Sequence, residues 1–361
     1  MTELSDLPLR PDLVGQQPYG APQLKVSAAL NVNENNYGVP SGAIAAMLGR
    51  IESLLGNLNR YPDREFVALR QQLANYLNSA SSEHRLSAAE LWAANGSNEI
   101  LQQVLLAFGG HGRTLMSFGP TYSMYPILAR ITMTGYSELP RRDDFSLDMA
   151  AAVTAISETN PALVFLCSPN NPTGCALSLQ EIAAIADANS GITLVDEAYA
   201  EFSDVPSSVS LLNGRPRLMV SRTMSKAFAL AGLRLGYLAA DSAVIDALRL
   251  VRLPYHLSAL TQAVASVALE HASEFQVSIA SICDERDRMA AAYRQLGLRV
   301  ADSQANFLLL QGIADSQLCF EALLREGVLV RQVSIPNSLR ISIGQPHEND
   351  SALRLIAELL G

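Results

Sequence analysis

One stretch of the sequence, from Ser221 to Tyr237, places a lysine in an unusual environment. Lys226 lies among small, hydroxylated and apolar residues, and Arg234 follows on its carboxyl side. Lysine is usually a solvated surface residue and is rarely buried without a partner. Apolar neighbours disfavour the ammonium form, so part of such a lysine is held as the neutral amine, which is the form that attacks a carbonyl carbon.

The residues around Lys226 also suit an anion. Thr223 and Ser225 offer hydroxyl donors and Arg234 offers a guanidinium, a combination that favours a phosphate dianion. A reactive amine beside a phosphate site predicts a ligand with both an aldehyde and a phosphate, which describes pyridoxal phosphate. By itself this stretch also fits an exposed lysine and arginine on an amphipathic helix, and the other motifs decide between the two interpretations.

Apolar runs without alternation indicate how these residues are positioned. We expect strands over 91–94, 114–118, 163–167, 192–195, 218–221 and 235–239, with helices such as 99–108 and 179–188 between them. Continuous hydrophobicity is typical of strands buried on both faces, as in a mostly parallel sheet with helices on each side. The sequence therefore predicts an α/β fold for the first two thirds of the chain.

The segments around this unit differ in pattern. Residues 1–40 are rich in Pro, Gly and Asn and predict an extended arm; one helix follows Ser41 as its N-cap, and a second covers about 64–78. After about residue 254 we expect a long, interrupted helical region over 259–296. Short strands near 299–301, 307–311, 328–330 and 339–343 and helices near 317–326 and 350–360 then predict a smaller α+β domain. The expected division is an arm over 1–40, a large cofactor-binding domain over 41–255 and a small domain over 256–361.

Polar residues follow the expected strands, at the sheet edge where ligands of parallel α/β sheets bind. After 91–94, Gly96 allows close backbone approach and Ser97 or Asn98 caps a helix, which predicts a phosphate seat on free N–H groups. An ordinary helix cap explains the same residues about equally well. After 114–118, Tyr122 can stack on a flat heterocycle, or it can be a partly buried tyrosine with its hydroxyl in water.

Two more strand ends add to this set. Asn171 lies in a turn of Asn, Pro and Gly and has a side-chain donor that can hold a phenolate oxygen, although turn formation alone also explains it. Asp196 ends a buried apolar strand, where a carboxylate is costly unless it meets a cation. A protonated pyridine nitrogen is such a cation, and aspartate is its recognised partner. Tyr199 can reach the phenolate oxygen beside Asn171.

Composition excludes several classes of protein. The chain has 361 residues, 49% of them hydrophobic, which suffices for a sizeable core. Its net charge of −9 disfavours nucleic acid as a partner. No apolar run reaches the roughly 20 residues of a membrane span, and the N-terminus lacks the order of a signal peptide. Four cysteines without a C-x-x-C pair and five scattered histidines predict a cytoplasmic protein with reduced thiols and no metal site.

The motifs together resemble those of a known superfamily. The run Ser225-Lys226 followed by Gly232-x-Arg234-x-Gly236-Tyr237 is similar to the signature of the aspartate-aminotransferase superfamily, the fold type I pyridoxal phosphate enzymes. The Asn-Pro-Thr-Gly turn at 171–174 is a strong match, and the order of the cofactor residues along the chain is also that of the superfamily. The resemblance implies a seven-stranded-type sheet in the large domain, an arm that joins the small domain, a catalytic Lys226 and Tyr122 over the cofactor ring.

Within that superfamily, the chain from about Tyr19 to Gly344 resembles the histidinol-phosphate aminotransferase family, the bacterial type especially. The segments 30–35 (Leu-Asn-Val-Asn-Glu-Asn) and 59–63 (Asn-Arg-Tyr-Pro-Asp) match it most closely, although Asn36 stands where the family usually has proline. The resemblance implies a homodimer with shared sites, in which one residue reaches the neighbouring subunit's cofactor phosphate, namely Tyr61. It also implies substrate contacts from Tyr19, Asn33, Tyr255, Arg331 and Arg340, with arginine forks for oxyanions and tyrosine walls for an imidazole ring.

The reaction implied by this resemblance exchanges an amino group in two half-reactions. L-Glutamate gives its nitrogen to the cofactor and leaves as 2-oxoglutarate, and imidazolylacetol phosphate then takes the nitrogen to become L-histidinol phosphate, a middle step of histidine biosynthesis. The amine of Lys226 moves the proton between the substrate Cα and the cofactor's C4′ carbon. The alternatives are an aromatic amino acid aminotransferase and a decarboxylase of an amino acid phosphate. A regulatory module would need an attached DNA-binding segment, for which the arm is too short and too acidic.

Overall fold

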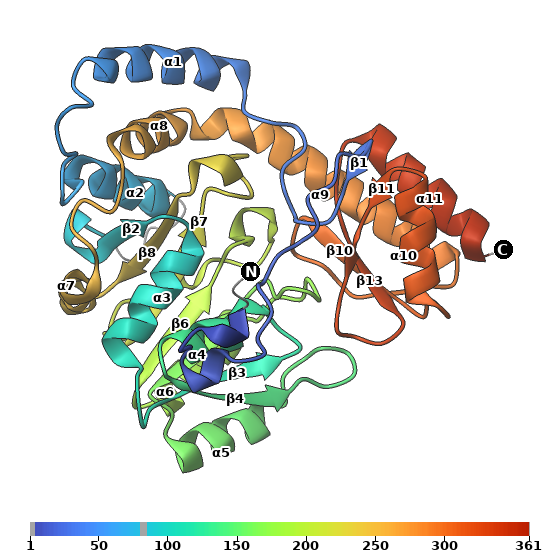
Figure 1. Ribbon diagram of the computed structural model, residues 1–361, viewed down its shortest axis with the longest axis horizontal. Coiled ribbons are helices and arrows are strands. Elements are labelled where there is room, and N and C mark those ends of the chain that lie inside the picture. Colours follow the sequence, from blue (N-terminus) through green and yellow to red (C-terminus); the bar gives the residue numbers. More distant parts are fainter. Residues whose placement is uncertain (1–3, 80–84, 361) are drawn as a thin grey trace.

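The computed structural model describes residues 4–79 and 85–360. Its largest element is a seven-stranded sheet in the order β2-β8-β7-β6-β5-β3-β4 (Figure 1). Six of its strands confirm the expected runs and the expected α/β class. The strands are β2 (Leu91–Ala94), β3 (Thr114–Gly119), β4 (Gly135–Pro140), β5 (Leu163–Cys167), β6 (Ile192–Asp196), β7 (Leu218–Thr223) and β8 (Gly236–Ala240).

The sheet is mostly parallel, as continuous hydrophobicity predicted. Only β8 runs antiparallel to its neighbours β7 and β2; the pairs β3–β4, β3–β5, β5–β6 and β6–β7 are parallel. Every residue of β5, β6, β7 and β8 is buried. One strand, β4, was not predicted, because it lies at the sheet edge and is largely exposed or half-buried. An edge strand lacks the apolar run on which the prediction depended.

Helices cover both faces of this sheet (Figure 1). The helices of this unit are α1 (Ser41–Leu55), α2 (Val67–Ser79), α3 (Ser97–Phe108), α4 (Met124–Ile131), α5 (Met149–Thr159), α6 (Leu179–Ala188), α7 (Ser242–Val251) and α8 (Ala259–Glu270). Helix α1 packs on the outside of α8 rather than on the sheet. Helix α2 begins three residues later than expected. The Asp63 carboxylate accepts hydrogen bonds from the backbone N–H of Glu65 and Val67, and Phe66 has φ +38°, so the intervening residues form a capping turn.

The small unit is built from residues near the C-terminus. Its four-stranded antiparallel sheet has the order β12-β13-β10-β9, from β12 (Arg331–Gln332), β13 (Ser338–Ser342), β10 (Phe307–Gln311) and β9 (Arg299–Val300). Helices α9 (Ala272–Gln295), α10 (Ser316–Arg325) and α11 (Pro346–Leu360) pack with it (Figure 1). The arm enters this unit through β1 (Ala28–Ala29), which pairs in parallel with β11 (Val328–Leu329).

Helix α8 belongs to the segment that the sequence analysis assigned to the small domain. It packs against α1 and α2 of the large unit, whereas α9 packs against α11 and β10 of the small unit. We therefore propose that the two domains meet at the junction of α8 and α9, later than the expected boundary after residue 255. The sequence could not show this, because the two helices read as one interrupted helical region.

Some features of the described residues bear on compartment and ligands. None of their helices combines the length and the apolarity needed to cross a membrane. The four cysteines are free thiols, with Cys167 and Cys319 buried. Within the same residues, no group of three or more His, Cys, Asp or Glu side chains is arranged to hold a metal ion.

Candidate active site

A cavity of about 710 Å³ opens where the carboxyl ends of the large-sheet strands meet the arm and the small unit. This is the edge at which parallel α/β sheets bind ligands, and the volume lies within the usual range for ligand pockets. The structure brings fourteen of the predicted site residues to its wall: Tyr19, Asn33, Ser97, Asn98, Tyr122, Asn171, Asp196, Tyr199, Thr223, Ser225, Lys226, Arg234, Arg331 and Arg340.

Lys226 lies in the turn that follows β7. Its Nζ donates a hydrogen bond of 2.8 Å to the carbonyl oxygen of Val32 in the arm. Burial, together with the nearby guanidinium groups of Arg340 and Arg234, lowers the pKa of Lys226 to about 8, while Glu34 acts in the opposite direction. A substantial share of the amine is therefore neutral near pH 8, as a carbonyl-attacking lysine requires.

The predicted phosphate donors gather at one end of the cavity. Ser97 begins helix α3, whose first N–H groups lack helical partners and whose dipole favours an anion. Thr223 and Ser225 share a hydrogen bond of 3.0 Å between their hydroxyl oxygens. Arg234, with φ +58°, turns its guanidinium toward this helix end.

Gly96 does not line the cavity but is required beside it. Its φ of +86° is strained for other residues, and a Cβ there would lie 2.6 Å from Nη2 of Arg234. Gly236 meets a similar restriction from the other side, because its Cβ would lie 2.3 Å from the backbone nitrogen of Ser97. The two glycines let β8, Arg234 and the start of α3 approach closely enough to form one anion cradle.

Asp196 lies at the floor of the cavity and is 2% exposed. Its two carboxylate oxygens accept hydrogen bonds of 3.2 Å from Tyr125 and from Ser221. Burial raises the pKa of Asp196 to about 6, against the opposing effect of these two hydroxyl donors. Asp196 forms no ion pair with any of the described residues, so a cationic group of a ligand in the cavity would stabilise its buried carboxylate.

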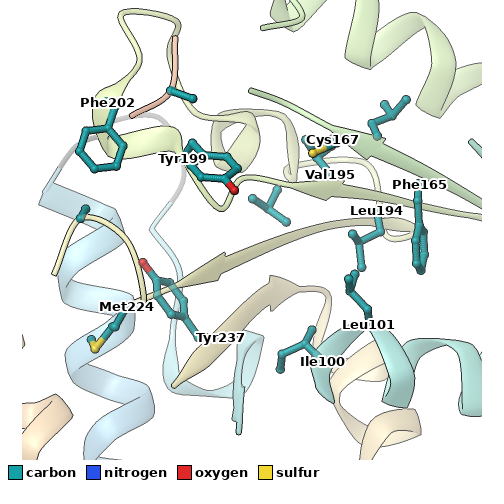
Figure 2. Packing of buried hydrophobic residues seen from close by; sticks show 14 of the residues in the cluster. Ile100, Leu101, Phe165, Cys167, Leu194, Val195, Tyr199, Phe202, Met224 and Tyr237 are labelled. Carbon is teal, nitrogen blue, oxygen red and sulfur yellow. The ribbon is translucent and has the colours of Figure 1, made fainter. Parts of the chain in front are cut away.

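A chain of polar side chains connects Asn33 with Arg340 across the cavity. The Tyr199 hydroxyl accepts hydrogen bonds from Asn33 (3.0 Å) and Asn171 (3.2 Å), and Asn171 accepts one of 2.6 Å from Arg340. Burial raises the pKa of Tyr199 to about 12, against the effect of Arg340. Figure 2 shows Tyr199 and Phe202 on the loop after β6, above the apolar strands that support the site.

Arg340 is held for an oxyanion. Its Nη2 donates 2.7 Å to the carbonyl oxygen of Asn31, and its guanidinium lies 5.2 Å above the ring of Phe307. Its Nε is buried and has no hydrogen-bond partner. Burial lowers the pKa of Arg340. An unsatisfied donor of this kind favours a bound carboxylate or phosphate.

The arm closes the cavity from the side of the small unit. Tyr19 lies with its ring 6.0 Å from the Arg331 guanidinium and near the Ser123 hydroxyl. The Tyr122 hydroxyl donates a hydrogen bond of 3.2 Å to the side-chain oxygen of Asn98, and its ring packs edge-on against Tyr125. Aromatic groups therefore line the cavity where a planar ring would lie.

Besides Gly96, two predicted residues do not line this cavity. Tyr61 and Tyr255 stack on each other, with their ring centroids 4.5 Å apart, and neither lines the cavity of its own chain. The expected contact of Tyr61 with a neighbouring subunit therefore stays a prediction. Tyr255 does not form a wall beside Tyr19 within its own chain, and its expected contact with a substrate likewise stays a prediction.

Sequence reasoning missed other residues of the site. The contact of Lys226 with the Val32 carbonyl could not be predicted from the sequence, because every residue type has the same backbone oxygen. Tyr125 lies in the first turn of α4, where its sequence position alone gives no sign of a contact with Asp196. Ser221 could have been found from strand register, since it pairs directly with Asp196 in the parallel sheet.

These observations fit pyridoxal phosphate. The buried carboxylate of Asp196 suits a protonated ring nitrogen, and Lys226, with its lowered pKa, suits an aldehyde. The cradle of hydroxyl, backbone and guanidinium donors suits a phosphate. The fit depends on groups that the fold leaves unsatisfied, rather than on motif matching.

The comparisons with known proteins agree with this chemistry. The family model described as aminotransferase class I and II matches residues 27–356. The chain belongs to this family. Histidinol-phosphate aminotransferases are similar over nearly the whole chain: the protein of Thermobifida fusca is 55% identical (96% of this chain, 93% of that protein). That of Paenarthrobacter aurescens is 50% identical (100% and 97%), and that of Mycolicibacterium smegmatis is 51% identical (99% and 95%).

Solved structures of aminotransferases share the fold. The histidinol-phosphate aminotransferase of Sinorhizobium meliloti, solved in complex with pyridoxal-5'-phosphate, superposes with a TM-score of 0.82 at 24% identity, covering 93% of this chain and 91% of that one. An aspartate aminotransferase of Thermus thermophilus superposes with a TM-score of 0.83 at 20% identity, covering 97% and 99%. At this identity the structures establish the fold type of this aminotransferase, while the sequence relatives bear on its substrate.

Proposed function

We propose that this aminotransferase uses pyridoxal phosphate to transfer an amino group from L-glutamate to imidazolylacetol phosphate, giving L-histidinol phosphate and 2-oxoglutarate. The observation that supports this most strongly is an identity of 50–55% over nearly the full length to proteins named histidinol-phosphate aminotransferase. The products place the enzyme in histidine biosynthesis. The shape and charge of the cavity are consistent with a planar ring attached to a dianion.

When bound, the cofactor supplies an aldehyde that carries the amino group and a protonated ring that withdraws electrons from the substrate Cα. Lys226 would anchor it between turnovers; once free, its Nζ would take the proton from the substrate Cα as general base and then deliver it to the cofactor's C4′ carbon as general acid. The Val32 carbonyl, 2.8 Å from Nζ, is in position to hold the free amine near the reacting carbon. The lowered pKa of Lys226 keeps its amine able to accept a proton at neutral to weakly basic pH.

Other side chains hold the cofactor at its remaining edges. Asp196 would hold the ring nitrogen and favour its protonated form, because the pair would remove the cost of a buried carboxylate. Asn171 and Tyr199 would donate to the cofactor's phenolate oxygen, and Tyr122 would stack on the ring. Gly96, Ser97, Asn98, Thr223, Ser225 and Arg234 would hold the phosphate.

The substrate binds toward the arm and the small unit. Arg340, with its unsatisfied Nε, grips the carboxylate of glutamate or the phosphate of the ketone, and Arg331 is a second anion ligand. Asn33 and Tyr19 contact the rest of the substrate. Because both half-reactions use one pocket, the same arginines must serve two differently shaped anions.

An aromatic amino acid aminotransferase is the main alternative, and relative rates with two acceptors separate the two functions. We expect kcat/KM to be about 10- to 100-fold higher for imidazolylacetol phosphate than for phenylpyruvate, because a phosphate dianion gains a further charge-assisted hydrogen bond of about 1.5–3 kcal/mol. Arg331→Ala should lower kcat/KM for imidazolylacetol phosphate more than it lowers kcat/KM for phenylpyruvate. Faster turnover of phenylpyruvate by the unaltered enzyme would favour the aromatic aminotransferase.

We also propose that the active form is a homodimer with shared sites. Large apolar side chains are exposed on α1, on the segment after it and near the end of α7: Ile44, Leu48, Leu55, Leu58, Tyr61, Leu250, Leu253 and Tyr255. Tyr61 is 80% exposed and stacks on Tyr255, and Leu250 is 86% exposed, so this chain leaves large apolar side chains uncovered. A second copy of this chain would cover this surface and bring Tyr61 to the phosphate end of the partner's cavity.

Mixed dimers test this arrangement. Lys226→Ala subunits and Tyr61→Phe subunits should each have low activity alone. A mixed dimer with shared sites has one site with both changes and one intact site, so activity after subunit exchange should exceed the sum of the two parents. Subunit exchange can be verified by mass spectrometry. Unchanged activity in a verified mixture would mean that Tyr61 acts within its own subunit or not at all.

A cytoplasmic location is a further proposal. Its support is the presence of four free cysteines in the described residues. The proposed partners are the small-molecule substrates and a second copy of the chain, with neither nucleic acid nor a membrane.

A further inference from the structure

A buried ion cluster lies on the far side of the strands that carry the cofactor residues. Arg222 of β7 donates from Nε (3.1 Å) and Nη2 (2.9 Å) to one oxygen of Glu197, and from Nη1 (3.2 Å) to Glu201. Their side chains are 10%, 4% and 5% exposed respectively. The chemistry proposed above uses none of these three residues, although burying three charges is costly.

The three residues alternate along the chain with residues of the cavity. Asp196 is followed by Glu197, Tyr199 precedes Glu201 by two positions, and Arg222 stands between Ser221 and Thr223. Successive side chains of a strand point to opposite faces. Ser221 bonds to Asp196 on the cavity side, and Arg222 bonds to Glu197 on the other side.

The cluster thus fixes the loop from Asp196 to Tyr199 from behind. At one end of the loop, the backbone N–H of Glu197 donates 2.8 Å to the carbonyl oxygen of Ser221. At the other end, Glu201 lies in the short 3-10 helix that begins directly after Tyr199. A single guanidinium therefore bridges the start and the end of the loop and ties both to β7.

Two further donors bind the carboxylate of Glu197. The Ser207 hydroxyl donates 2.7 Å to one oxygen of Glu197, and the backbone N–H of Ser208 donates 2.6 Å to the other. With Arg222, these donors leave Glu197 little freedom to rotate. The loop cannot shift relative to β7 without breaking charge-assisted hydrogen bonds in a dry environment.

We propose that Arg222, Glu197 and Glu201 are positioning residues that set the distance between Asp196, Tyr199 and the phosphate donor Thr223, and so hold the ring nitrogen of the cofactor against Asp196. A planar cofactor gripped at both ends needs its contacts fixed relative to one another. Arginine is suited to this position because it can bridge two carboxylates, which a lysine ammonium does less rigidly. This inference rests on the proposed function, since it assumes that pyridoxal phosphate occupies the cavity.

The test measures cofactor binding and ring protonation rather than turnover. Full-length Arg222→Lys and Glu201→Gln proteins would be stripped of cofactor and titrated with pyridoxal phosphate, and then loaded with cofactor labelled with ¹⁵N in the ring for NMR. We expect Kd to rise about 10-fold or more, on the scale seen when the groups behind metal ligands are removed. We also expect the ¹⁵N signal to move toward that of the unprotonated ring.

Arg70→Met is the matched control. Arg70 is also a buried arginine, 3% exposed, but its Nε donates to the carbonyl oxygen of Leu91, away from the cavity. It should lower the unfolding temperature while leaving the Kd and the ¹⁵N signal unchanged. If Arg222→Lys does not fold, Glu201→Gln removes only one charge and keeps the side-chain length.

The outcomes separate this inference from the proposed function. If the unaltered protein fails to bind pyridoxal phosphate, the proposed function is wrong. If the unaltered protein binds it, and folded Arg222→Lys and Glu201→Gln proteins both retain its Kd and ¹⁵N signal, the positioning role is wrong. If Arg70→Met changes the Kd and the ¹⁵N signal as much as the cluster variants do, the cluster contributes only to general stability and the positioning role is wrong.

Discussion

Replacing Lys226 by alanine should lower kcat for transamination by about 10⁴-fold or more. The variant loses the group that moves the Cα proton, worth about 10²–10⁴-fold, and also the anchor that holds the cofactor in the cavity. Steady-state kinetics with L-glutamate and imidazolylacetol phosphate measure the loss, and the absorbance of the lysine-bound cofactor should disappear with it.

The sequence provides a simple control for this change. It contains only one other lysine, Lys25, which is exposed in the arm. Lys25→Ala should keep both the activity and the absorbance of the unaltered enzyme. Substantial turnover by Lys226→Ala would require another proton carrier in the cavity, and the role given to Lys226 would have to be abandoned.

Replacing Asp196 by asparagine should lower the rate of Cα deprotonation by roughly 10²–10³-fold, as expected when an electrostatic partner in a desolvated site is lost. Asparagine has nearly the same shape and can still interact with Tyr125 and Ser221, so the cavity should keep its form. It cannot stabilise a positive ring nitrogen. Single-turnover kinetics with L-glutamate isolate this step from product release.

Stability measurements distinguish this effect from simple damage to the fold. The pKa of Asp196 is raised to about 6 in the folded protein without cofactor, from an ordinary value of 3.8. A raised pKa means that stability is lost as the pH rises from the ordinary value through 6, because the folded state must then hold a buried charge. Cofactor-free Asp196→Asn protein should therefore be at least as stable as the unaltered protein above pH 6. Near-normal single-turnover rates in a stable variant would contradict the role of Asp196.

Much of the fold could be predicted because the central strands are buried on both faces. Strands β5, β6 and β7 appear in the sequence as continuous apolar runs, and their ends locate Asn171, Asp196 and Thr223 at one sheet edge. Strand β4 escaped prediction because an exposed edge strand has no such run. The packing of α8 against α1, on which we base the proposed domain boundary, could not be predicted either, because it is a tertiary contact and not a local pattern.

The candidate site divides in the same way. Lys226 could be predicted from the residues alone, because lysine is uncommon among apolar residues, whereas Arg340 was predicted from the resemblance to a family. The hydrogen bond from Lys226 to the Val32 carbonyl joins residues 194 positions apart through a backbone atom that any residue supplies. The contact between Arg222 and Glu201 was likewise hidden, because both look like ordinary charged residues until the fold buries them together.

The site is organised around Lys226, and one labelling experiment tests this most directly. Borohydride reduction of the cofactor-loaded protein makes the bond between lysine and cofactor permanent, and mass spectrometry of the peptides then locates the added mass. With two lysines in the chain, the peptide that contains Lys226 should carry the whole of the label and the peptide that contains Lys25 none. Label on Lys25, or a protein that takes up pyridoxal phosphate without labelling Lys226, would contradict this account of the site.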